Sequence, residues 1–137
     1  MRLTKQADCA LRVLMYLAAA DRRPVTALSM ARRLGVPTSQ VTGVLATLVQ
    51  HHFVDSCSDT DAAYCLSRPI IAIRLGEVVR HFAPARIEEG CEYCLSRVPC
   101  RMRIAVAEGA RAFIQELDAY TLADIVGDGY QRLALVT

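Results

Sequence analysis

The sequence predicts a mainly α-helical protein: a winged helix-turn-helix with a small β-hairpin wing, then a cysteine-rich loop and a long C-terminal helix. Three observations carry this prediction. Two short amphipathic segments flank a Gly-containing turn, which is typical of a helix-turn-helix. Two short β-prone runs follow, with a turn-forming stretch between them, as expected for a hairpin. Three cysteines then fall within ten residues, and a long amphipathic segment comes after them.

Length, composition and charge narrow the possible functions. A chain of 137 residues suits one ordinary domain, or a small domain with an appendage, and 53% hydrophobic residues argue against wholesale disorder. Residues 1–81 carry ten Lys and Arg against six Asp and Glu, whereas residues 82–137 carry six against eight. This split favours an anion such as a phosphate backbone as the partner of the first half. Without a targeting or bilayer-spanning segment, we expect a cytoplasmic protein with no membrane partner.

The helix-turn-helix is expected in the first 50 residues. Apolar side chains recur in residues 2–20 at alternating spacings of four and three, which gives a helix one apolar face. Pro24 cannot continue that helix. We expect Thr26 to cap a short second helix that ends at Gly35, and a third helix from about Thr38 to Gln50.

A hairpin wing is expected next. The runs FVDSC and AYCLS are β-prone, and the SDTD between them favours a turn. Cys57 and Cys65 flank this turn symmetrically and can face each other across the hairpin. Because disulfides are rare in cytosolic proteins, we expect both thiols to be reduced. Arg68 and Pro69 end the hairpin, and residues 70–82 are expected to form one further helix.

The helix-turn-helix favours duplex DNA as the partner, because a winged helix lays its second helix in the major groove. The exposed face of that helix would present hydrogen-bonding side chains to bases and phosphates: Thr38, Ser39, Gln40, Thr42 and Thr47. Residues 37–50 contain no Lys or Arg. The phosphate charge would therefore be met around the edges, by Arg2, Lys5, Arg32, Arg33 and Arg68. The alternative is a winged helix that contacts proteins.

The loop over 83–100 contains the motif C-x2-C-x5-C, formed by Cys91, Cys94 and Cys100. Three thiolates in one loop can converge on one metal centre, and both iron–sulfur clusters and zinc favour thiolate ligands. Zinc sites usually take four protein ligands, and no second C-x-x-C is present, so a cluster suits the spacing better. The alternatives are reduced thiols, a zinc-stapled interaction module, or a thiol–disulfide oxidoreductase. The last is disfavoured because no βαβ unit precedes the motif, so we expect no enzyme.

A long helix with an apolar seam is expected over residues 101–120. The seam recurs at spacings of four and three, close to a heptad repeat, and comprises Met102, Val106, Ala110, Phe113, Leu117 and Tyr120. A seam outside a compact winged domain needs a partner, and a second copy is the simplest one. We therefore expect a homodimer whose chains contain a DNA-binding domain (1–82), a cysteine loop (83–100), and a dimerisation helix with its tail (101–137).

Two stretches resemble a known family. The start, MRLTKQADCALRVLMYLAA, resembles the first helix of the NsrR/IscR/RirA regulators, which are dimeric winged-helix proteins that carry iron–sulfur clusters. The cysteine motif, running into RMRIAVAEGARAFIQELDAYTLADIV, resembles their cluster loop, dimerisation helix and closing signature. The context of Asp8 and the TLADIV ending resemble the nitric-oxide-sensing NsrR type most closely. From the spacing alone, Asp8 is expected only to pair with Arg12 one turn later.

The resemblance implies an iron–sulfur cluster, 4Fe–4S in preference to 2Fe–2S, held by Cys91, Cys94 and Cys100. It implies that Asp8 of the other subunit is the fourth ligand and that Arg12 lies near the cluster. It further implies a repressor that binds a palindromic operator and senses nitric oxide, with iron or redox sensing as the alternative. The chain departs from the family in its short C-x2-C spacing, its Gly-free wing, and Gly43 where a Lys is common.

Overall fold

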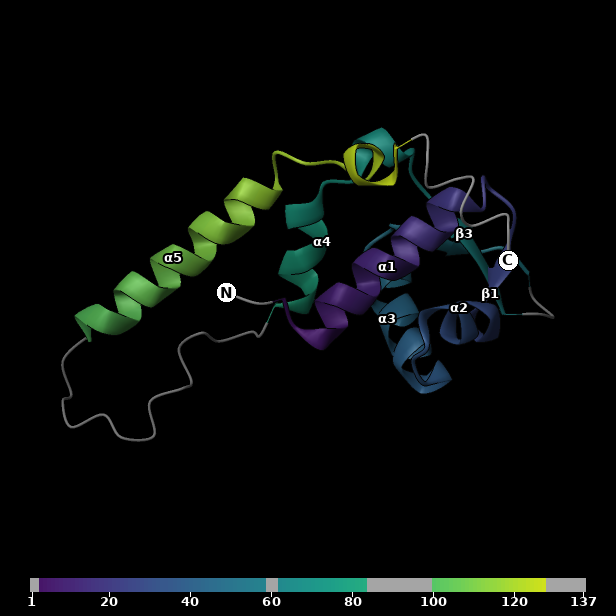
Figure 1. Cartoon of the computed structure of the whole chain (residues 1–137), viewed down its shortest axis with the longest axis horizontal. Coiled ribbons are helices and arrows are strands. Elements are labelled where there is room, and N and C mark those ends of the chain that lie inside the picture. Colours follow the sequence, from purple (N-terminus) through teal and green to yellow (C-terminus); the bar gives the residue numbers. More distant parts are fainter. Residues whose placement is uncertain (1–2, 59–61, 84–99, 128–137) are drawn as a thin grey trace.

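The computed structural model describes residues 3–58, 62–83 and 100–127 (Figure 1). It is mainly helical with a small antiparallel sheet, and the predicted winged helix-turn-helix is confirmed. The elements in chain order are α1 (Lys5–Ala19), β1 (Val25–Thr26), α2 (Ala27–Leu34), α3 (Thr38–Gln50), β2 (Val54–Ser56), β3 (Ala63–Leu66), η1 (Ile70–Ala72), α4 (Leu75–Phe82) and α5 (Arg101–Leu117).

The first three helices begin and end where local chemistry favours it. The hydroxyl of Thr4 accepts a hydrogen bond from the amide of Ala7 at 3.0 Å, which caps α1. Thr26 caps α2 in the same way, as predicted, by accepting from the amide of Ser29 at 3.2 Å. Gly35 ends α2 with a φ of 67°, a left-handed conformation that glycine adopts without steric cost. The predicted bounds of α3 are also confirmed.

The apolar faces of these helices meet in one core. Its largest fully buried side chains come from α1, α2, α3 and the segments after them: Leu14, Met30, Leu45, Leu48, Phe53, Ile73 and Leu122. Leu122 follows α5 in the chain, so residues beyond the long helix contribute to the core of the winged domain.

The wing is a three-stranded sheet in the order β1-β3-β2. The hairpin of β2 and β3 was predicted, and its register pairs Val54 with Leu66. Strand β1, which pairs Val25 with Tyr64, is not predicted from the sequence. A two-residue strand is too short to show the alternating pattern by which strands are recognised.

The two wing cysteines are bonded to each other, so the expectation of reduced thiols is wrong for this structure. Cys57 and Cys65 form a disulfide across 6.4 Å between their Cα atoms. Cys65 lies opposite Asp55, and the amide of Cys57 donates to the carbonyl of Ala63 at 2.8 Å. Because Cys57 lies two residues beyond Asp55, the two cysteines are diagonal neighbours on one face of the hairpin. This register brings the two thiols close enough to bond, which the cellular compartment alone does not indicate.

Residues 70–82 form two helices and not the single one that was predicted. The short helix η1 ends at Ala72, Ile73 and Arg74 are extended, and α4 starts at Leu75. The extended residues between the two helices pair with the chain that follows α5. The amide of Leu75 donates to the carbonyl of Tyr120 at 3.0 Å. The carbonyl of Ile73 likewise accepts from the amide of Leu122 at 2.8 Å. The chain after α5 thus pairs with the chain before α4.

That returning segment carries its own helix start. The backbone amide of Thr121 donates to Oδ2 of Asp124 at 2.7 Å, and the amide of Asp124 donates to Oγ1 of Thr121 at 3.4 Å. This reciprocal arrangement is a capping box, and residues 122–127 are helical. Leu122 is fully buried and Val126 nearly so. The TLAD sequence therefore begins a helical turn that closes the core. The tail after Gly127 lies outside the described residues.

The long helix α5 projects from the body of the molecule (Figure 1). It ends at Leu117, three residues earlier than predicted, because the chain turns at Asp118 toward α4. Gly76 of α4 allows this close approach, since a Cβ atom there would lie 2.6 Å from the carbonyl oxygen of Ile114.

Candidate DNA interface and metal centre

Helix α3 presents an uncharged polar face. Thr38, Ser39 and Thr42 are exposed, while the apolar residues between and after them are buried against α1 and α2. The hydroxyl of Thr42 donates to the carbonyl of Ser39 at 3.0 Å, within the helix. These hydroxyls can donate and accept hydrogen bonds with base edges or phosphates. Thr47, by contrast, is only half-exposed and donates to the carbonyl of Gly43 at 3.4 Å.

The predicted phosphate contacts fall into separate groups. Lys5, Arg32 and Arg33 are exposed, on α1 and on the last turn of α2. Arg2 lies outside the described residues. Their positions at the edges of the helix-turn-helix are compatible with contacts to a phosphate backbone.

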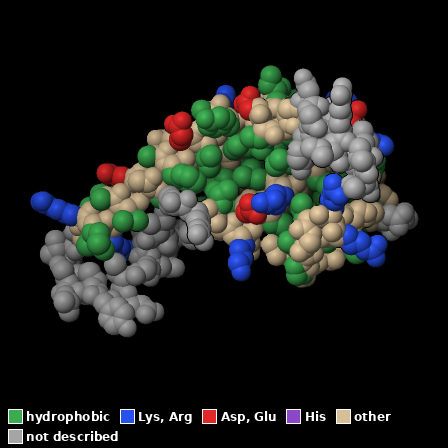
Figure 2. All heavy atoms as spheres, viewed as in Figure 1, with side chains coloured by type: hydrophobic (Ala, Val, Ile, Leu, Met, Phe, Trp, Pro, Cys, Tyr) green, Lys and Arg blue, Asp and Glu red, His purple; other side chains and the backbone are tan. Residues whose placement is uncertain are grey.

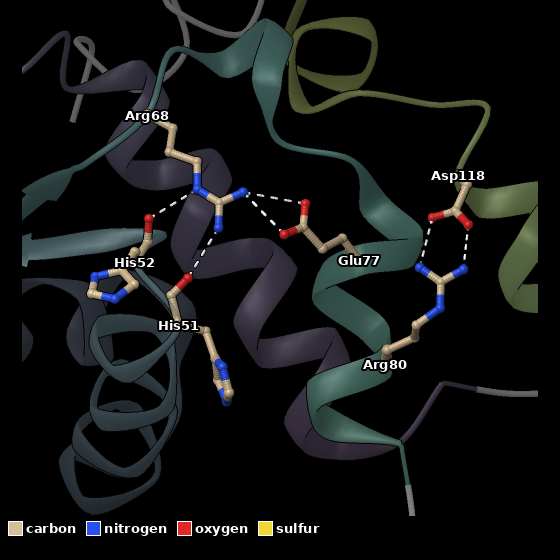
Figure 3. Close-up of polar contacts among 6 residues, drawn as sticks. All are labelled: His51, His52, Arg68, Glu77, Arg80 and Asp118. Atoms are coloured by element: carbon tan, nitrogen blue, oxygen red, sulfur yellow. Dashed lines mark hydrogen bonds and ion pairs between the residues drawn. The ribbon is translucent and has the colours of Figure 1, made fainter.

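Arg68, the remaining predicted phosphate contact, is half-buried and bonded to residues of its own chain (Figure 3). Its Nε and Nη2 atoms donate to the backbone carbonyls of His52 and His51, each at 3.0 Å. Its Nη1 atom donates to both carboxylate oxygens of Glu77 on α4, at 3.0 and 3.2 Å. The guanidinium carbon also lies 4.3 Å from the ring centroid of Phe53. Arg68 thus caps the end of α3 and joins it to α4, which is a structural role that the sequence analysis missed.

Two histidine rings make a second contact between these helices. His51, at the end of α3, stacks on His81 of α4 with 3.7 Å between ring centroids. The edge of Phe53 also meets His81, with 5.8 Å between centroids. Burial and, secondarily, the neighbouring His51 lower the pKa of His81.

Asp8 lies on the surface of α1, and its carboxylate is about half exposed. Its Oδ2 atom accepts a hydrogen bond from Nε of Arg12 at 2.8 Å, so the ion pair predicted from the spacing is confirmed. Cys100 is a free thiol at the start of α5 and is half-buried. Figure 1 shows that this end of α5 points away from α1 of the same chain. Asp8 and Cys100 of one chain are therefore not brought together.

The other two predicted thiolate ligands, Cys91 and Cys94, lie outside the described residues. Within the described ranges, no three His, Cys, Asp or Glu side chains are grouped so that they could hold a metal ion. The two ligands that can be assessed do fit an iron–sulfur cluster chemically. Cys100 offers a thiolate that is bonded to no other cysteine, and Asp8 offers an accessible carboxylate oxygen.

A surface pocket of about 340 Å³ separates α1 from the turn of the helix-turn-helix. We call it the α1–α3 pocket. Its lining includes Asp8, Cys9 and Arg12 from α1, Val36 from the turn, and Gln40 from α3. Burial raises the pKa of the Cys9 thiol, and a side-chain hydrogen bond with Gln40 partly opposes this effect.

The predicted seam of α5 divides into two halves. Met102 and Val106, in the first half, are 66% and 53% exposed, and Ile104 beside them is also exposed. In the second half Ala110 is buried, Phe113 and Leu117 are half-buried, and Tyr120 beyond the helix is exposed. Figure 2 shows hydrophobic side chains on the projecting part of this helix. Among the described residues, the first half of the seam has no cover from its own chain.

Comparisons with known proteins match this architecture. The model of the Rrf2 family, described as iron-dependent transcriptional regulators, matches residues 3–128. The structure of IscR from T. potens is 20% identical, with a TM-score of 0.72 over 94% of this chain and 88% of that one. CymR from Staphylococcus aureus is 18% identical, with a TM-score of 0.69 over 90% and 96%. CymR from B. subtilis, the global cysteine regulator, is 18% identical, with a TM-score of 0.68 over 92% and 96%.

At these identities the solved structures support the fold alone. None of the helices in the described ranges has both the length and the hydrophobicity needed to cross a bilayer.

Proposed function

Because this chain belongs to the Rrf2 family of transcriptional regulators, we propose that it is a homodimeric repressor whose iron–sulfur cluster senses nitric oxide. One observation carries the proposal. Asp8 lies exposed on α1 beside the helix-turn-helix, whereas Cys100 directly precedes the end of α5 that projects farthest from α1 (Figure 1). If both bind one cluster, they come from two chains, and the cluster then links the dimer to the DNA-binding domains.

The proposed ligands are Cys91, Cys94 and Cys100 of one subunit and Asp8 of the partner subunit. When bound, the cluster supplies iron that reacts with nitric oxide. A carboxylate is a weaker ligand than thiolate for soft cluster iron and is more easily displaced. When no cluster is bound, Nε of Arg12 lies 2.8 Å from Oδ2 of Asp8 and balances the charge of the carboxylate. This ion pair holds the carboxylate on the outer face of α1. Asp8 is therefore the ligand whose release would free the partner's DNA-binding domain.

The exposed first half of α5 supports the dimer. Met102 and Val106 present apolar surface on a helix that projects from the domain, and burying such surface favours association. Cys100 directly precedes this helix, so a cluster bound there lies next to the proposed interface. The spacing of the two α3 helices, which sets the fit to a palindrome, would then depend on the cluster.

The DNA contacts are proposed from the helix-turn-helix geometry. Thr38, Ser39 and Thr42 face outward from α3 and would contact base edges, while Lys5 and Arg33 would contact phosphates. The chain would then divide into a winged DNA-binding domain (1–82), a cysteine loop (83–100), and a dimerisation helix with its tail (101–137). The final helical turn, from Leu122, packs in the core of the first of these.

A second candidate function is the sensing of iron. The description of the matching family as iron-dependent favours it, and the same ligands would serve. In that case the loss of the cluster under iron limitation, and not its reaction with nitric oxide, would release the operator.

The test is anaerobic purification followed by absorption spectroscopy, iron and sulfide counts, and DNA binding. We expect an iron–sulfur spectrum and binding to a palindrome selected from random duplexes, with the binding lost on nitric oxide titration. Cys94→Ala should lose the cluster, whereas the matched Cys57→Ala, outside the loop, should keep it. Binding that survives nitric oxide but not iron removal would favour iron sensing. A colourless protein with stoichiometric zinc would contradict both.

A further inference from the structure

The structure separates Gln40 from the other polar residues at the start of α3. Thr38, Ser39 and Thr42 are exposed, whereas Gln40 is half-buried. Gln40 lines the α1–α3 pocket together with Asp8 and Cys9, and it makes a side-chain hydrogen bond with Cys9. Its side chain is therefore directed toward α1, and not toward the face that would meet a major groove.

The partner of Gln40 is adjacent to the proposed cluster ligand. Cys9 is 3% exposed and follows Asp8 within the continuous helix α1. Because the two residues share one helical turn, a shift of Asp8 along or around the helix axis also moves Cys9. Such a movement would reach α3 through the contact between Cys9 and Gln40.

The start of α3 can transmit a small shift because it is firmly held. Val41, next to Gln40, is fully buried, and the amide of Gln40 donates to the carbonyl of Pro37 at 3.0 Å. The amide of Val36 donates to the carbonyl of Ala31 at 3.1 Å, which fixes the turn before it. Tightly packed elements move as units and not by gradual deformation. A push on Gln40 therefore reorients Thr38 and Ser39 with it.

We propose that Gln40 is a positioning residue that couples the Asp8 face of α1 to the recognition helix, and that it does not read bases. This inference rests on the proposed function, because it assigns the route by which cluster binding at Asp8 alters DNA binding. On this proposal, Gln40 would not join Thr38, Ser39 and Thr42 in the DNA contacts.

The test compares Gln40→Ala with Thr42→Ala, a matched variant on the exposed side of the same helix. The probe is a duplex selected from random sequence with cluster-loaded wild-type protein. The Kd for this duplex is measured with cluster-loaded and cluster-free forms of each variant. Allosteric coupling is typically about 5- to 150-fold, and this sets the expected ratio of the two wild-type constants.

We expect Gln40→Ala to lower that ratio by about fivefold, the effect of one net hydrogen bond. Thr42→Ala should weaken both forms and keep the ratio. Gln40→Met, which keeps the length of the side chain but not its hydrogen bond, should act like Gln40→Ala and guards against a packing defect. If Gln40→Ala weakens both forms equally, Gln40 is a base contact and the coupling is overturned.

A second readout uses cluster-free protein and no DNA. Alkylation of Cys9 by iodoacetamide, followed by peptide mass spectrometry, should be faster in Gln40→Ala than in wild type or Thr42→Ala. An unchanged rate overturns the contact on which the coupling depends. A wild-type Kd ratio of one overturns the proposed function and the coupling together. A large wild-type ratio that Gln40→Ala leaves intact overturns the coupling alone.

Discussion

Arg80 and Asp118 form a two-point ion pair that ties α4 to the end of α5 (Figure 3). Nη1 of Arg80 donates to Oδ1 of Asp118 at 3.0 Å, and Nη2 donates to Oδ2. The backbone carbonyl of Asp118 also accepts from Nη1 of Arg74 at 2.7 Å. With Gly76 beneath them, these contacts make the junction through which the projecting helix is attached to the winged domain.

Acid should weaken this junction. The hydrogen bond from Arg80 lowers the pKa of Asp118 below its ordinary value. A carboxyl group with a lowered folded-state pKa stabilises the fold above its unfolded-state pKa and loses that contribution as pH falls through the folded-state pKa. Because both side chains are partly exposed, Asp118→Asn should cost no more than about 1 kcal/mol at pH 7. Urea unfolding should show this difference shrinking below about pH 4. A difference that is the same at pH 7 and pH 3 would contradict the ion pair.

Gly76→Ala should destabilise the protein. The added Cβ would meet the Asp118 side chain and lie 2.6 Å from the carbonyl oxygen of Ile114, so α4 and α5 would have to move apart. Overpacking of this kind costs about 1–3 kcal/mol. Gly43→Ala is the control, because no atom lies within 4 Å of its added Cβ and the change should gain about 0.5–1 kcal/mol in a helix. Urea titrations measure the free energy of unfolding of both variants. If Gly76→Ala stabilised the protein as Gly43→Ala does, the close approach of α4 and α5 would be refuted.

Arg68→Ala should reduce stability more than Arg32→Ala, a change at an exposed residue of α2. It removes donors from two backbone carbonyls at the end of α3 and leaves Glu77 without its cation. Bonds of this charged type contribute about 1.5–3 kcal/mol each in mutational series. Arg68→Lys should restore little, because an ammonium cannot reproduce the planar fork. Arg32→Ala should instead leave the melting temperature nearly unchanged and lower DNA affinity. If Arg68→Ala were fully stable but bound DNA weakly, Arg68 would be a DNA contact and not a structural residue.

Val106→Glu should give monomers without unfolding the domain. Val106 is 53% exposed on the projecting half of α5, so its own chain does not need it, whereas a second copy would have to bury the new charge. Gln115→Glu adds the same charge at an exposed position of the same helix and should leave the dimer intact. Sedimentation velocity and circular dichroism distinguish dissociation from unfolding. Variants of Phe113 or Leu117 are less informative, because both are half-buried in their own chain.

Asp8→Ala should leave a brown protein whose cluster is less stable and whose nitric oxide titration differs from that of wild type. The reason is that three thiolates would remain while the fourth position is open to solvent. Arg12→Ala is the matched control, since it breaks the same 2.8 Å ion pair but keeps the carboxylate. Matching spectra and titrations for Asp8→Ala and wild type would remove Asp8 from the proposed ligands. The ion pair alone accounts for only about 0.2–0.5 kcal/mol.

The helices were predictable because their signals are local. Thr26 and Gly35 mark the ends of α2 by capping chemistry, and the apolar spacing of α3 fixes its bounds. The break at Ile73 and Arg74 was not predictable, because it depends on pairing with Tyr120 and Leu122, almost fifty residues away. Periodicity within a segment carries no information about such a partner.

The sequence predicted which residue types form the candidate site, but it predicted less well where their side chains point. The Asp8–Arg12 pair follows from a spacing of four, and the structure contains it. Spacing also grouped Gln40 with Thr38, Ser39 and Thr42, yet a side chain at the edge of an exposed helical face can turn either way. The charge of Arg68 alone suggests an exposed side chain that contacts phosphates. Its actual partners, the backbone carbonyls of His51 and His52, lie within reach only in the folded chain.

The pairing of Ile73 with Leu122 makes the long helix an insertion in the winged domain and not an appendage to it. The chain leaves the domain after Phe82, runs through α5, and comes back at Thr121 to complete the same core. A fragment that stops at Phe82 would lack Leu122, whose side chain is fully buried in the core of the domain. During synthesis the domain could not finish folding until residues beyond Thr121 had left the ribosome. The long helix is attached to α4 through Asp118 at its C-terminal end, so its orientation relative to α3 depends on that junction.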